Sequence, residues 1–563
     1  MDLEQHQSVP GSGASDTLAE VVRRRAGDRR VGLKFEGDSW SWAEVETEMQ
    51  TRSAFLLGQL GAGPPHVGVL LDNVPEFLFL IGGAALAGCV IVGINPTRRG
   101  TELGRDIRHA DCQLIITGSG YAPLLDGVDV GDAAGHVFVT DSSAYGAALA
   151  PYGAAATPPP PAPGDLFMLI FTSGSTGAPK AVRLTQGRAA RAATGQMGFG
   201  PDDVLYCSMP IFHGNALMSI VFPALASGAS LVLKRKFSAS GFLPDVRDHH
   251  CTFTSTVGRA LAYILATPPT DHDKDHSLKF VLAPESSTAD MEAFTRRFGP
   301  PVFGGYGSSE NAIVMIPHPG HPPDALGVPA PGLDIAIVDP GTERECPRAK
   351  FDGAGKLMNG DEAIGEIVGR NAVDRFEGYY NNDAAARERT RSGWYWSGDL
   401  AYRDDDDVFY FAGRTLDWIR VDGENFAAAP VERVLRRFPG LTGVAVFGVP
   451  DDTTADDQVM AVLEQPDPRS FDPVAFDAFL DEQRDLGTKW SPRYVRVVGS
   501  LPVTATNKID KAPLRRAGWM TTGTDPVFWR SRPRSPLREI DATDRSEIFR
   551  RFEVNGRSRR LQP

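Results

Sequence analysis

A glycine- and hydroxyl-rich segment, residues 172–180, carries side chains whose chemistry suits phosphate binding. It follows an apolar run, residues 166–171, that predicts a buried strand. Glycines let a loop bring backbone N–H groups close to a ligand, hydroxyls donate to phosphate oxygens, and a lysine adds a point charge. We therefore expect a triphosphate to contact Thr172, Ser173, Gly174, Ser175, Thr176, Gly177 and Lys180.

The spacing differs from the phosphate loop that places Gly-Lys-Ser/Thr at the start of a helix. Pro179 precedes the lysine here, and residues 181–185 predict a second strand. A strand–loop–strand arrangement offers no helix N-terminus, so the hydroxyls and Lys180 must supply the contacts. An ordinary surface turn is the alternative, and the later motifs decide against it.

The pattern Ser-Gly-Ser-Thr-Gly-x-Pro-Lys resembles the signature of the adenylate-forming enzymes, which include acyl-CoA synthetases, luciferases and nonribosomal adenylation domains. Their reaction joins two anions, a carboxylate and the α-phosphate of ATP. The site must therefore supply positive charge, in-line geometry and a dry cavity. The resemblance implies ATP and Mg2+ as cofactors, with Glu310 and Thr172 as the metal-binding residues.

Residues 306–310 and, as a second segment, residues 283–285 resemble two adenine-binding motifs of the family. In the first, Tyr306 would stack on adenine, Ser309 would reach the α-phosphate, and Glu310 would hold Mg2+. Ser309 stands where the family usually has Thr. The second segment lines adenine through backbone atoms. The implied nucleotide-binding residues are Tyr306, Gly307, Ser308, Ser309, Ala283, Pro284 and Glu285.

Residues 395–400 resemble the motif whose aspartate, here Asp399, accepts hydrogen bonds from both ribose hydroxyls. Paired carboxylate oxygens suit a diol. Arg414 would contact the ribose or the phosphates at the domain junction. The family's hinge residue usually lies two positions after this arginine. The family usually has an Asp or Lys at that hinge position, whereas this chain has Leu416 there and an acidic residue, Asp417, one position later. The identity of the hinge residue therefore stays open by one position.

Residues 501–510 resemble the C-terminal catalytic motif. Lys508 would bridge the substrate carboxylate and the α-phosphate in the transition state. The family commonly has Gly before this lysine, and Asn507, which tolerates turn geometry, replaces it. We expect Lys511, which follows Asp510, to face solvent. The catalytic set is thus Lys508, Glu310 and His213, the last from a Pro-x-x-His motif beside the acyl pocket.

The substrate class rests on two further segments. Residues 217–222 are apolar and could line an alkyl tunnel, although an ordinary buried helix face has the same spacing. Ser238 follows Phe237 where amino-acid-activating relatives carry Asp, which argues against an amino acid. No carrier-protein segment follows residue 520. We expect a fatty acid, with a long-chain fatty acid–CoA ligase as the favoured interpretation, while the exact chain length and substitution stay open.

Gly423, Glu424 and Asn425 resemble the Gly-Glu-Asn loop of long- and very-long-chain fatty acyl-CoA synthetases, including fatty-acid transport proteins. The resemblance implies coenzyme A as the acceptor and two half-reactions. Lys508 acts in the first, and a rotated C-terminal domain brings Gly423 in for the second. The alternatives are a fatty acyl-AMP ligase that loads a carrier protein and a non-catalytic fatty-acid-binding or uptake protein.

Strands alternate with helices through much of the chain, which predicts an α/β fold with doubly wound sheets. A small β subdomain is expected over residues 330–412. The predicted division is a flexible N-terminus at 1–15, an adenylating domain at 16–412, a small mobile α+β C-terminal lid domain at 413–521 and a basic tail at 522–563. The tail could be solvated, lie on a domain or contact an anionic membrane.

Composition sets the remaining expectations. The chain has 563 residues and a net charge of −13, which argues against nucleic acid as a partner. The five cysteines include no C-x-x-C pair, which fits a reducing compartment. Residues 77–94 lack charge, but their glycines favour a buried helix and strand over a membrane span. We expect a cytoplasmic protein with possible peripheral membrane contact, in an undetermined oligomeric state.

Overall fold

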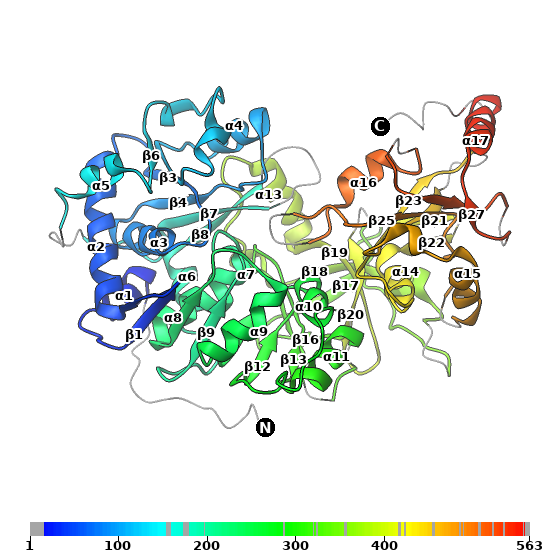
Figure 1. Cartoon of the computed structure of the whole chain (residues 1–563), viewed down its shortest axis with the longest axis horizontal. Coiled ribbons are helices and arrows are strands. Elements are labelled where there is room, and N and C mark those ends of the chain that lie inside the picture. The colour runs from blue at the N-terminus through cyan, green and yellow to red at the C-terminus, as the bar shows by residue number, and fades with distance from the viewer. Residues whose placement is uncertain are drawn as a thin grey trace.

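The computed structural model describes residues 16–557, except for 154–158, 173–179, 196, 285, 287, 319, 323–324, 354–356, 415–417, 422–423, 453–456, 484–485, 488, 505–507, 521–522, 533–534 and 556. Its elements form several sheets with helices packed on them (Figure 1). The smaller C-terminal part, drawn in yellow to red, lies beside the larger N-terminal part. The predicted α/β class, with a larger N-terminal and a smaller C-terminal domain, is confirmed.

A six-stranded sheet carries the glycine-rich segment at one edge. Its order is β6-β5-β3-β4-β7-β8, with parallel pairing except between β7 and β8. The strands are β3 (His66–Leu70), β4 (Val90–Gly93), β5 (Leu114–Thr117), β6 (Val137–Val139), β7 (Leu166–Thr172) and β8 (Lys180–Thr185).

A seven-stranded sheet, β13-β12-β11-β9-β10-β1-β2, lies below the first in Figure 1. Only the pairing of β1 with its hairpin partner β2 is antiparallel among these described strands. The strands are β1 (Val31–Phe35), β2 (Asp38–Ser41), β9 (Val204–Cys207), β10 (Ser230–Leu233), β11 (Phe253–Ser255), β12 (Phe280–Leu282) and β13 (Val302–Phe303).

The two sheets share a central helix layer. The largest apolar core joins α1 (Leu18–Arg23), α3 (Pro75–Ala87) and α6 (Gln186–Ala193) with residues of β4, β7, β9 and β10. On the outer faces, α4 (Gly100–His109) covers the first sheet, and α9 (Ala239–Asp248), α10 (Gly258–Leu265) and α11 (Thr288–Phe298) cover the second. Helices on both faces of each sheet are the doubly wound arrangement.

An antiparallel sheet forms the predicted β subdomain. Its order is β14-β15-β16-β20-β19-β18-β17. The strands are β14 (Tyr306–Gly307), β15 (Val314–Ile316), β16 (Ala325–Pro329), β17 (Ile335–Val338), β18 (Gly365–Gly369), β19 (Tyr395–Arg403) and β20 (Phe409–Arg414). The acidic run 404–407 forms the β19–β20 turn, in which the Asp404 amide donates to the Val408 carbonyl.

The C-terminal part is built on the sheet β23-β24-β25-β26-β27. Its strands are β23 (Gly443–Pro450), β24 (Asp457–Glu464), β25 (Tyr494–Val498), β26 (Val527–Trp529) and β27 (Arg538–Glu539). A separate hairpin pairs β21 (Trp418–Val421) with β22 (Glu424–Ala427). On one face lie α14 (Ala428–Leu435) and α15 (Pro473–Glu482), and on the other α16 (Lys511–Ala517) and α17 (Ala542–Val554).

The segment expected as a basic tail is part of this sheet. β26 pairs with β25, and Trp529, Ile548 and Phe552 are buried in the C-terminal core. The sequence-based interpretation gave more weight to the many arginines of this segment than to its few apolar residues. The domain boundary at 412/413 stays our proposal.

Two helix starts differ in their caps. Ser41 caps α2 (Trp42–Gln59) in a capping box with Glu44. At α3, however, neither Asp72 nor Asn73 is the cap. The N-cap is Val74, and the buried Asn73 amide instead binds the backbone of residues 209, 211 and 234.

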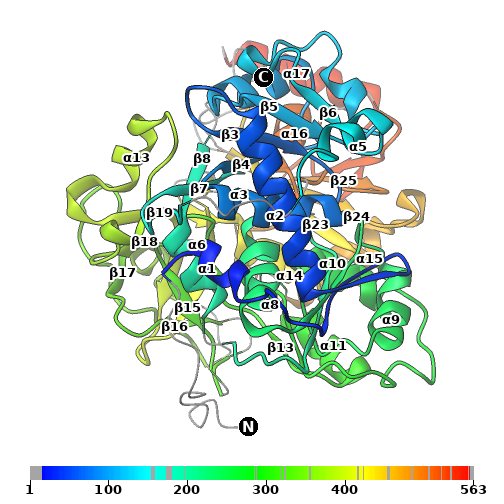
Figure 2. The same ribbon diagram turned by 90° about the vertical axis from the view of Figure 1, so that its left-hand side faces the viewer.

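The uncharged run at residues 77–94 forms α3 and β4, joined at Gly88, as predicted. Among the described residues, no helix has both the length and the apolarity needed to cross a membrane. Figure 2 shows the 18-residue α2 crossing the face of the N-terminal part, with α3 beside it. All five cysteines are buried and free of disulfides.

Candidate active site

The glycine-rich segment joins two antiparallel strands. Thr172 ends β7 and faces Lys180, the first residue of β8, across the ladder. Lys180 is buried, and burial together with the Arg389 charge lowers the pKa of its ammonium. Ser173, Gly174, Ser175, Thr176 and Gly177 lie outside the described residues. The strand–loop–strand frame agrees with the prediction, and the phosphate contacts stay a proposal.

A tyrosine connects this hairpin to Glu310. The Tyr379 hydroxyl donates to Oε1 of the buried Glu310 at 2.7 Å, and Arg389 Nε lies 3.4 Å from the same hydroxyl oxygen. The ammonium of Lys180 lies 5.8 Å from the centre of the Tyr379 ring. A carboxylate, a lysine and an arginine thus surround one aromatic side chain. This cluster places the proposed phosphate and Mg2+ groups in one site.

The expected adenine and ribose residues also meet. Tyr306, in β14, donates a hydrogen bond of 2.6 Å to Oδ2 of Asp399 in β19. Burial and the carboxylate both raise the pKa of the Tyr306 hydroxyl, which therefore stays a donor. The bond fixes the ring and the carboxylate relative to each other across the antiparallel sheet.

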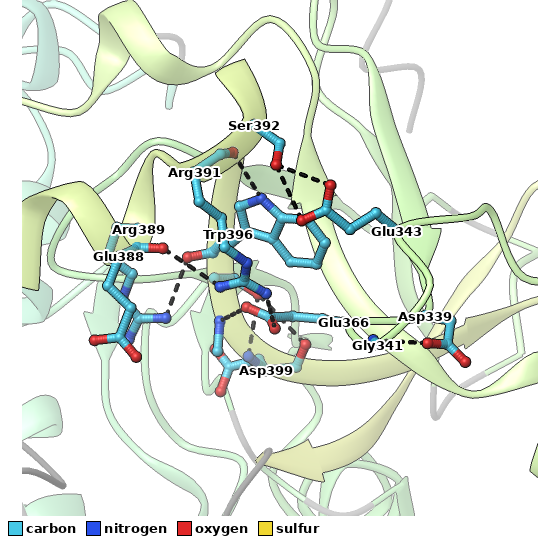
Figure 3. A network of polar contacts seen from close by, with 12 residues as sticks. Asp339, Gly341, Glu343, Glu366, Glu388, Arg389, Arg391, Ser392, Trp396 and Asp399 are labelled. Atoms are coloured by element: carbon cyan, nitrogen blue, oxygen red, sulfur yellow. Dashed lines mark hydrogen bonds and ion pairs between the residues drawn. The ribbon is translucent and has the colours of Figure 1, made fainter.

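A second network holds the turn before Asp399 (Figure 3). The buried carboxylate of Glu366 accepts the Gly398 amide at 2.6 Å and a contact from Arg391 at 3.4 Å. Arg391 lies over the Trp396 ring, 3.6 Å from its centre. Gly398 has φ +75°, and a side chain there would collide with Arg389. Contacts from Glu366 and Arg391 therefore stabilise the backbone just before Asp399.

The remaining nucleotide residues lie at neighbouring strand ends. Ala283 follows β12, and its amide donates to the Phe303 carbonyl of β13, three residues before Tyr306. Pro284 comes next in the chain, and Glu285 lies outside the described residues. Gly307 completes β14, Ser308 follows it, and the Ser309 carbonyl accepts from the buried Arg188 of α6.

Lys508 reaches the same region from the C-terminal part. It lies in a tight turn, where its carbonyl accepts the Thr504 amide and its amide donates to the Thr504 hydroxyl. Its charge acts on His213, since burial first and Lys508 second lower the pKa of that imidazole to about 3. His213 is therefore neutral near pH 7. The neighbouring Lys511 does not face solvent as we expected, because it pairs with Glu432 at 2.8 Å.

His213 offers a polar atom in an apolar setting. Its Nε2 is buried and has no hydrogen-bond partner among the described residues. The rings of Phe212 and His213 lie 4.4 Å apart. Beyond it, α7 (Gly214–Ala216), a π-helical turn (Leu217–Val221) and α8 (Phe222–Ser227) form one continuous stretch. Such turns are frequent at functional sites. An unpartnered ring nitrogen suits a substrate carboxylate oxygen.

The apolar residues 217–222 pack mainly in the central core, although Met218 is only half-buried. This favours the helix-face interpretation for most of them. Ser238 caps α9 by accepting the Gly241 amide, so it holds a structural position rather than a charge.

The junction and CoA segments are only partly described. Arg414 ends β20 and its Cα lies opposite Asp399 in the ladder. Glu424 and Asn425 begin β22 in the two-stranded hairpin, while Gly423, Leu416 and Asp417 lie outside the described residues. Their roles stay proposals.

Sequence reasoning missed Tyr379, Arg389, Arg188 and Glu366. Tyr379 and Glu310 are 69 positions apart, so spacing gives no hint of their contact. The aromatic pair Tyr379-Tyr380 beside Gly378 was the available signal, and it reads as an ordinary turn.

The residues present fit ATP and Mg2+. Mg2+ in nucleotide sites takes one or two carboxylates plus phosphate oxygens and water. The described residues contain no cluster of three metal-ligating side chains, so Glu310 with ligand phosphates is the matching donor set. When bound, the metal would neutralise phosphate charge next to Lys180.

Comparison with known proteins supports this chemistry. The sequence model of the AMP-binding enzymes matches residues 18–380. A steroid-22-oyl-CoA synthetase of Rhodococcus jostii (strain RHA1) is 48% identical over 97% of this chain and 99% of its own. The medium/long-chain fatty-acid–CoA ligase FadD17 of Mycobacterium tuberculosis (strain ATCC 25618 / H37Rv) is 44% identical over 88% of this chain and 95% of its own.

A solved structure shows the same fold. A crystal structure of the anthranilate CoA ligase AuaEII with anthranoyl-AMP aligns with a TM-score of 0.78 at 21% identity, over 92% of this chain and 99% of that one. The chain belongs to the AMP-binding enzymes. Its activity is ATP-dependent acyl-CoA ligation through an adenylate, with ATP, Mg2+ and CoA as cofactors.

Proposed function

We propose that the acid substrate is a steroid whose side chain ends in a carboxylate. The 48% identity to a steroid-22-oyl-CoA synthetase, over nearly the full length of both chains, carries this proposal. The predicted fatty acid shares the same requirements, an apolar body and one carboxylate. The neutral, partly buried His213 beside Phe212 supports an acid of either kind.

In the first half-reaction the carboxylate oxygen attacks the α-phosphorus of ATP. The bond from that phosphorus to the bridging oxygen breaks, and pyrophosphate leaves. Lys508 supports this step by placing positive charge between the two anions. Lys180 would bind the phosphates and Asp399 the ribose. Nε2 of His213, when protonated in the neutral ring, would donate to the carboxylate.

In the second half-reaction the CoA thiolate attacks the acyl carbon and AMP leaves. We assign the approach of CoA to the C-terminal segment with Gly423, Glu424 and Asn425, on the family resemblance. Delivery to a carrier protein is the competing outcome, and it would give acyl-AMP without free acyl-CoA.

A medium- or long-chain fatty acid is the second candidate, favoured by the FadD17 relatives. The test measures pyrophosphate release with a steroid carrying a carboxylate at carbon 22, with dodecanoate and palmitate, and with acetate and benzoate. Mass spectrometry then identifies the CoA thioester. The proposal requires the highest kcat/KM for the steroid acid, and a higher value for palmitate would replace it with the second candidate.

A further inference from the structure

The N-terminal helix α10 and the C-terminal sheet meet through a buried cluster of charged and polar side chains. Arg259 Nη2 lies 3.0 Å from Oε1 of Glu464, the last residue of β24. The Tyr263 hydroxyl, one turn along α10, donates to the same carboxylate oxygen at 3.1 Å. Both charged side chains are more than nine-tenths buried.

The same arginine also contacts the backbone at the start of the segment that carries Lys508. Arg259 Nη2 donates to the Leu501 carbonyl at 3.3 Å. Leu501 is buried in the C-terminal core, and the chain then pairs Val503 with Ile509 around Lys508. The Asp510 amide donates back to the Pro502 carbonyl. A short, hydrogen-bonded path therefore links Arg259 to the backbone on both sides of Lys508.

Within each part, neighbouring residues restrict the side chains of the cluster. Gly443 lies opposite Glu464 in the sheet, and a side chain at Gly443 would collide with Oε2 of Glu464. Arg259 stacks against the Tyr263 ring, 5.2 Å from its centre, and donates to its hydroxyl. Nη1 of Arg259 and Oε2 of Glu464 have no hydrogen-bond partner among the described residues.

We propose that Arg259, with Tyr263 and Glu464, is a positioning clamp that holds the C-terminal part where Lys508 enters the active site. Arg259 is not among the residues proposed to contact nucleotide or acid. It acts through Leu501 and Glu464 on the placement of Lys508. This inference rests on the proposed two half-reactions, because only the first needs Lys508 in the site.

The clamp therefore affects one half-reaction and not the other. Losing it frees the C-terminal part from the Lys508-in orientation, and a coupling of this kind changes an equilibrium by about 5- to 150-fold. Adenylate formation falls accordingly, while the KM for ATP changes little. Thioester formation from supplied acyl-AMP is unchanged or faster, since the competing orientation has lost its anchor.

The test compares Arg259→Ala, Glu464→Gln and the double variant with wild type and with Arg469→Ala. Arg469 makes an exposed ion pair with Glu539 within the C-terminal part and serves as the matched control. Adenylation is followed by ATP–pyrophosphate exchange, and thioesterification by release of AMP from synthetic acyl-AMP and CoA. We expect the rate of ATP–pyrophosphate exchange to fall at least about fivefold in each single clamp variant. The double variant should lose no more of this rate than either single variant does, because the two residues act through one contact.

Hydrogen exchange tests the clamp without any acid. The amides of α10 and of Leu501, Val503 and Thr504 should undergo hydrogen exchange faster in both clamp variants than in the Arg469→Ala control. The clamp proposal would be overturned if the variants lost the same fraction of rate in both half-reactions, or if hydrogen exchange at the α10 amides were unchanged. If wild type activates no acid, the proposed function fails, while the hydrogen-exchange result still decides whether the contact holds the two parts together.

Discussion

The Tyr379 hydroxyl donates a 2.7 Å hydrogen bond to Oε1 of Glu310, and its ring faces the Lys180 ammonium. One side chain thus orients the proposed Mg2+ carboxylate and borders the proposed phosphate lysine. Since a partner that orients a metal ligand typically affects affinity about 10- to 100-fold, this bond should matter to nucleotide chemistry.

Tyr379→Phe removes the hydroxyl and keeps the ring. We expect the Mg2+ concentration at half-maximal pyrophosphate release to rise about tenfold, with the acid KM unchanged. A Mg2+ titration of initial rates measures this. Tyr380→Phe is the control, because that hydroxyl binds Asp111 instead. If the Mg2+ titration curves of the two variants were the same, the proposed role of the Tyr379 hydroxyl in orienting Glu310 would be wrong.

Lys508→Ala should abolish adenylate formation while nucleotide still binds. The loss of a preorganised positive charge predicts a decrease of about 100- to 1,000-fold in pyrophosphate release. Isothermal titration with ATP and Mg2+ should give nearly the wild-type Kd. Lys511→Ala, which breaks the Glu432 pair instead, should lower the melting temperature but keep adenylation. Full turnover in Lys508→Ala would refute the assigned role.

The imidazole of His213 predicts a pH effect on stability. Its folded-state pKa of about 3 lies below the ordinary 6.5, so below pH 6.5 the unfolded chain takes up a proton that the folded chain does not. This residue therefore lowers stability as pH falls from 6.5 toward 3 and has no such effect above 6.5.

His213→Gln should remove part of the acid sensitivity. Between pH 7 and pH 5 the wild type should lose at most about 2 kcal/mol more unfolding free energy than the variant. Urea unfolding at the two pH values measures the difference. His136→Gln, at an exposed histidine, should behave as wild type. In Lys508→Ala, NMR titration should show the His213 pKa moved upward, because a neighbouring positive charge is gone.

Tyr306→Phe should weaken ATP binding through Asp399. Without the 2.6 Å bond the carboxylate loses its fixed orientation, and we expect the KM for ATP to rise about tenfold, with a smaller change in kcat. Steady-state kinetics at saturating acid provides the test. Phe is isosteric, so stacking on adenine is kept. An unchanged ATP KM would show that Asp399 needs no support from this ring.

Local signals in the sequence predicted much of the fold. The capping box at Ser41 and the apolar run before Thr172 both specify structure within a few residues. Asn73, which lies just before α3 without capping it, shows the limit of such local signals. Its amide is used by chain segments more than a hundred residues away, and no local pattern contains that information.

Motifs located the proposed catalytic residues but not what orients them. Asp399 and Glu310 stand in recognisable segments, whereas Glu366, Tyr379 and Arg259 bond across sequence separations of 32, 69 and 205 residues. Such contacts depend on how sheets pack. The C-terminal strands after residue 526 were missed for a different reason, because the three buried residues of β26, Val527–Trp529, form a short apolar run within an arginine-rich segment.

Burial of every cysteine has a practical consequence for enzymology. Burial raises the pKa of Cys89, Cys207 and Cys251 to about 12, so their thiolates are scarce and shielded at neutral pH. Aromatic disulfide reagents should therefore titrate free CoA with almost no background from the folded enzyme. A single cysteine introduced on the surface would react selectively with a fluorophore. Rotation of the C-terminal domain could then be followed by fluorescence without replacing the native cysteines.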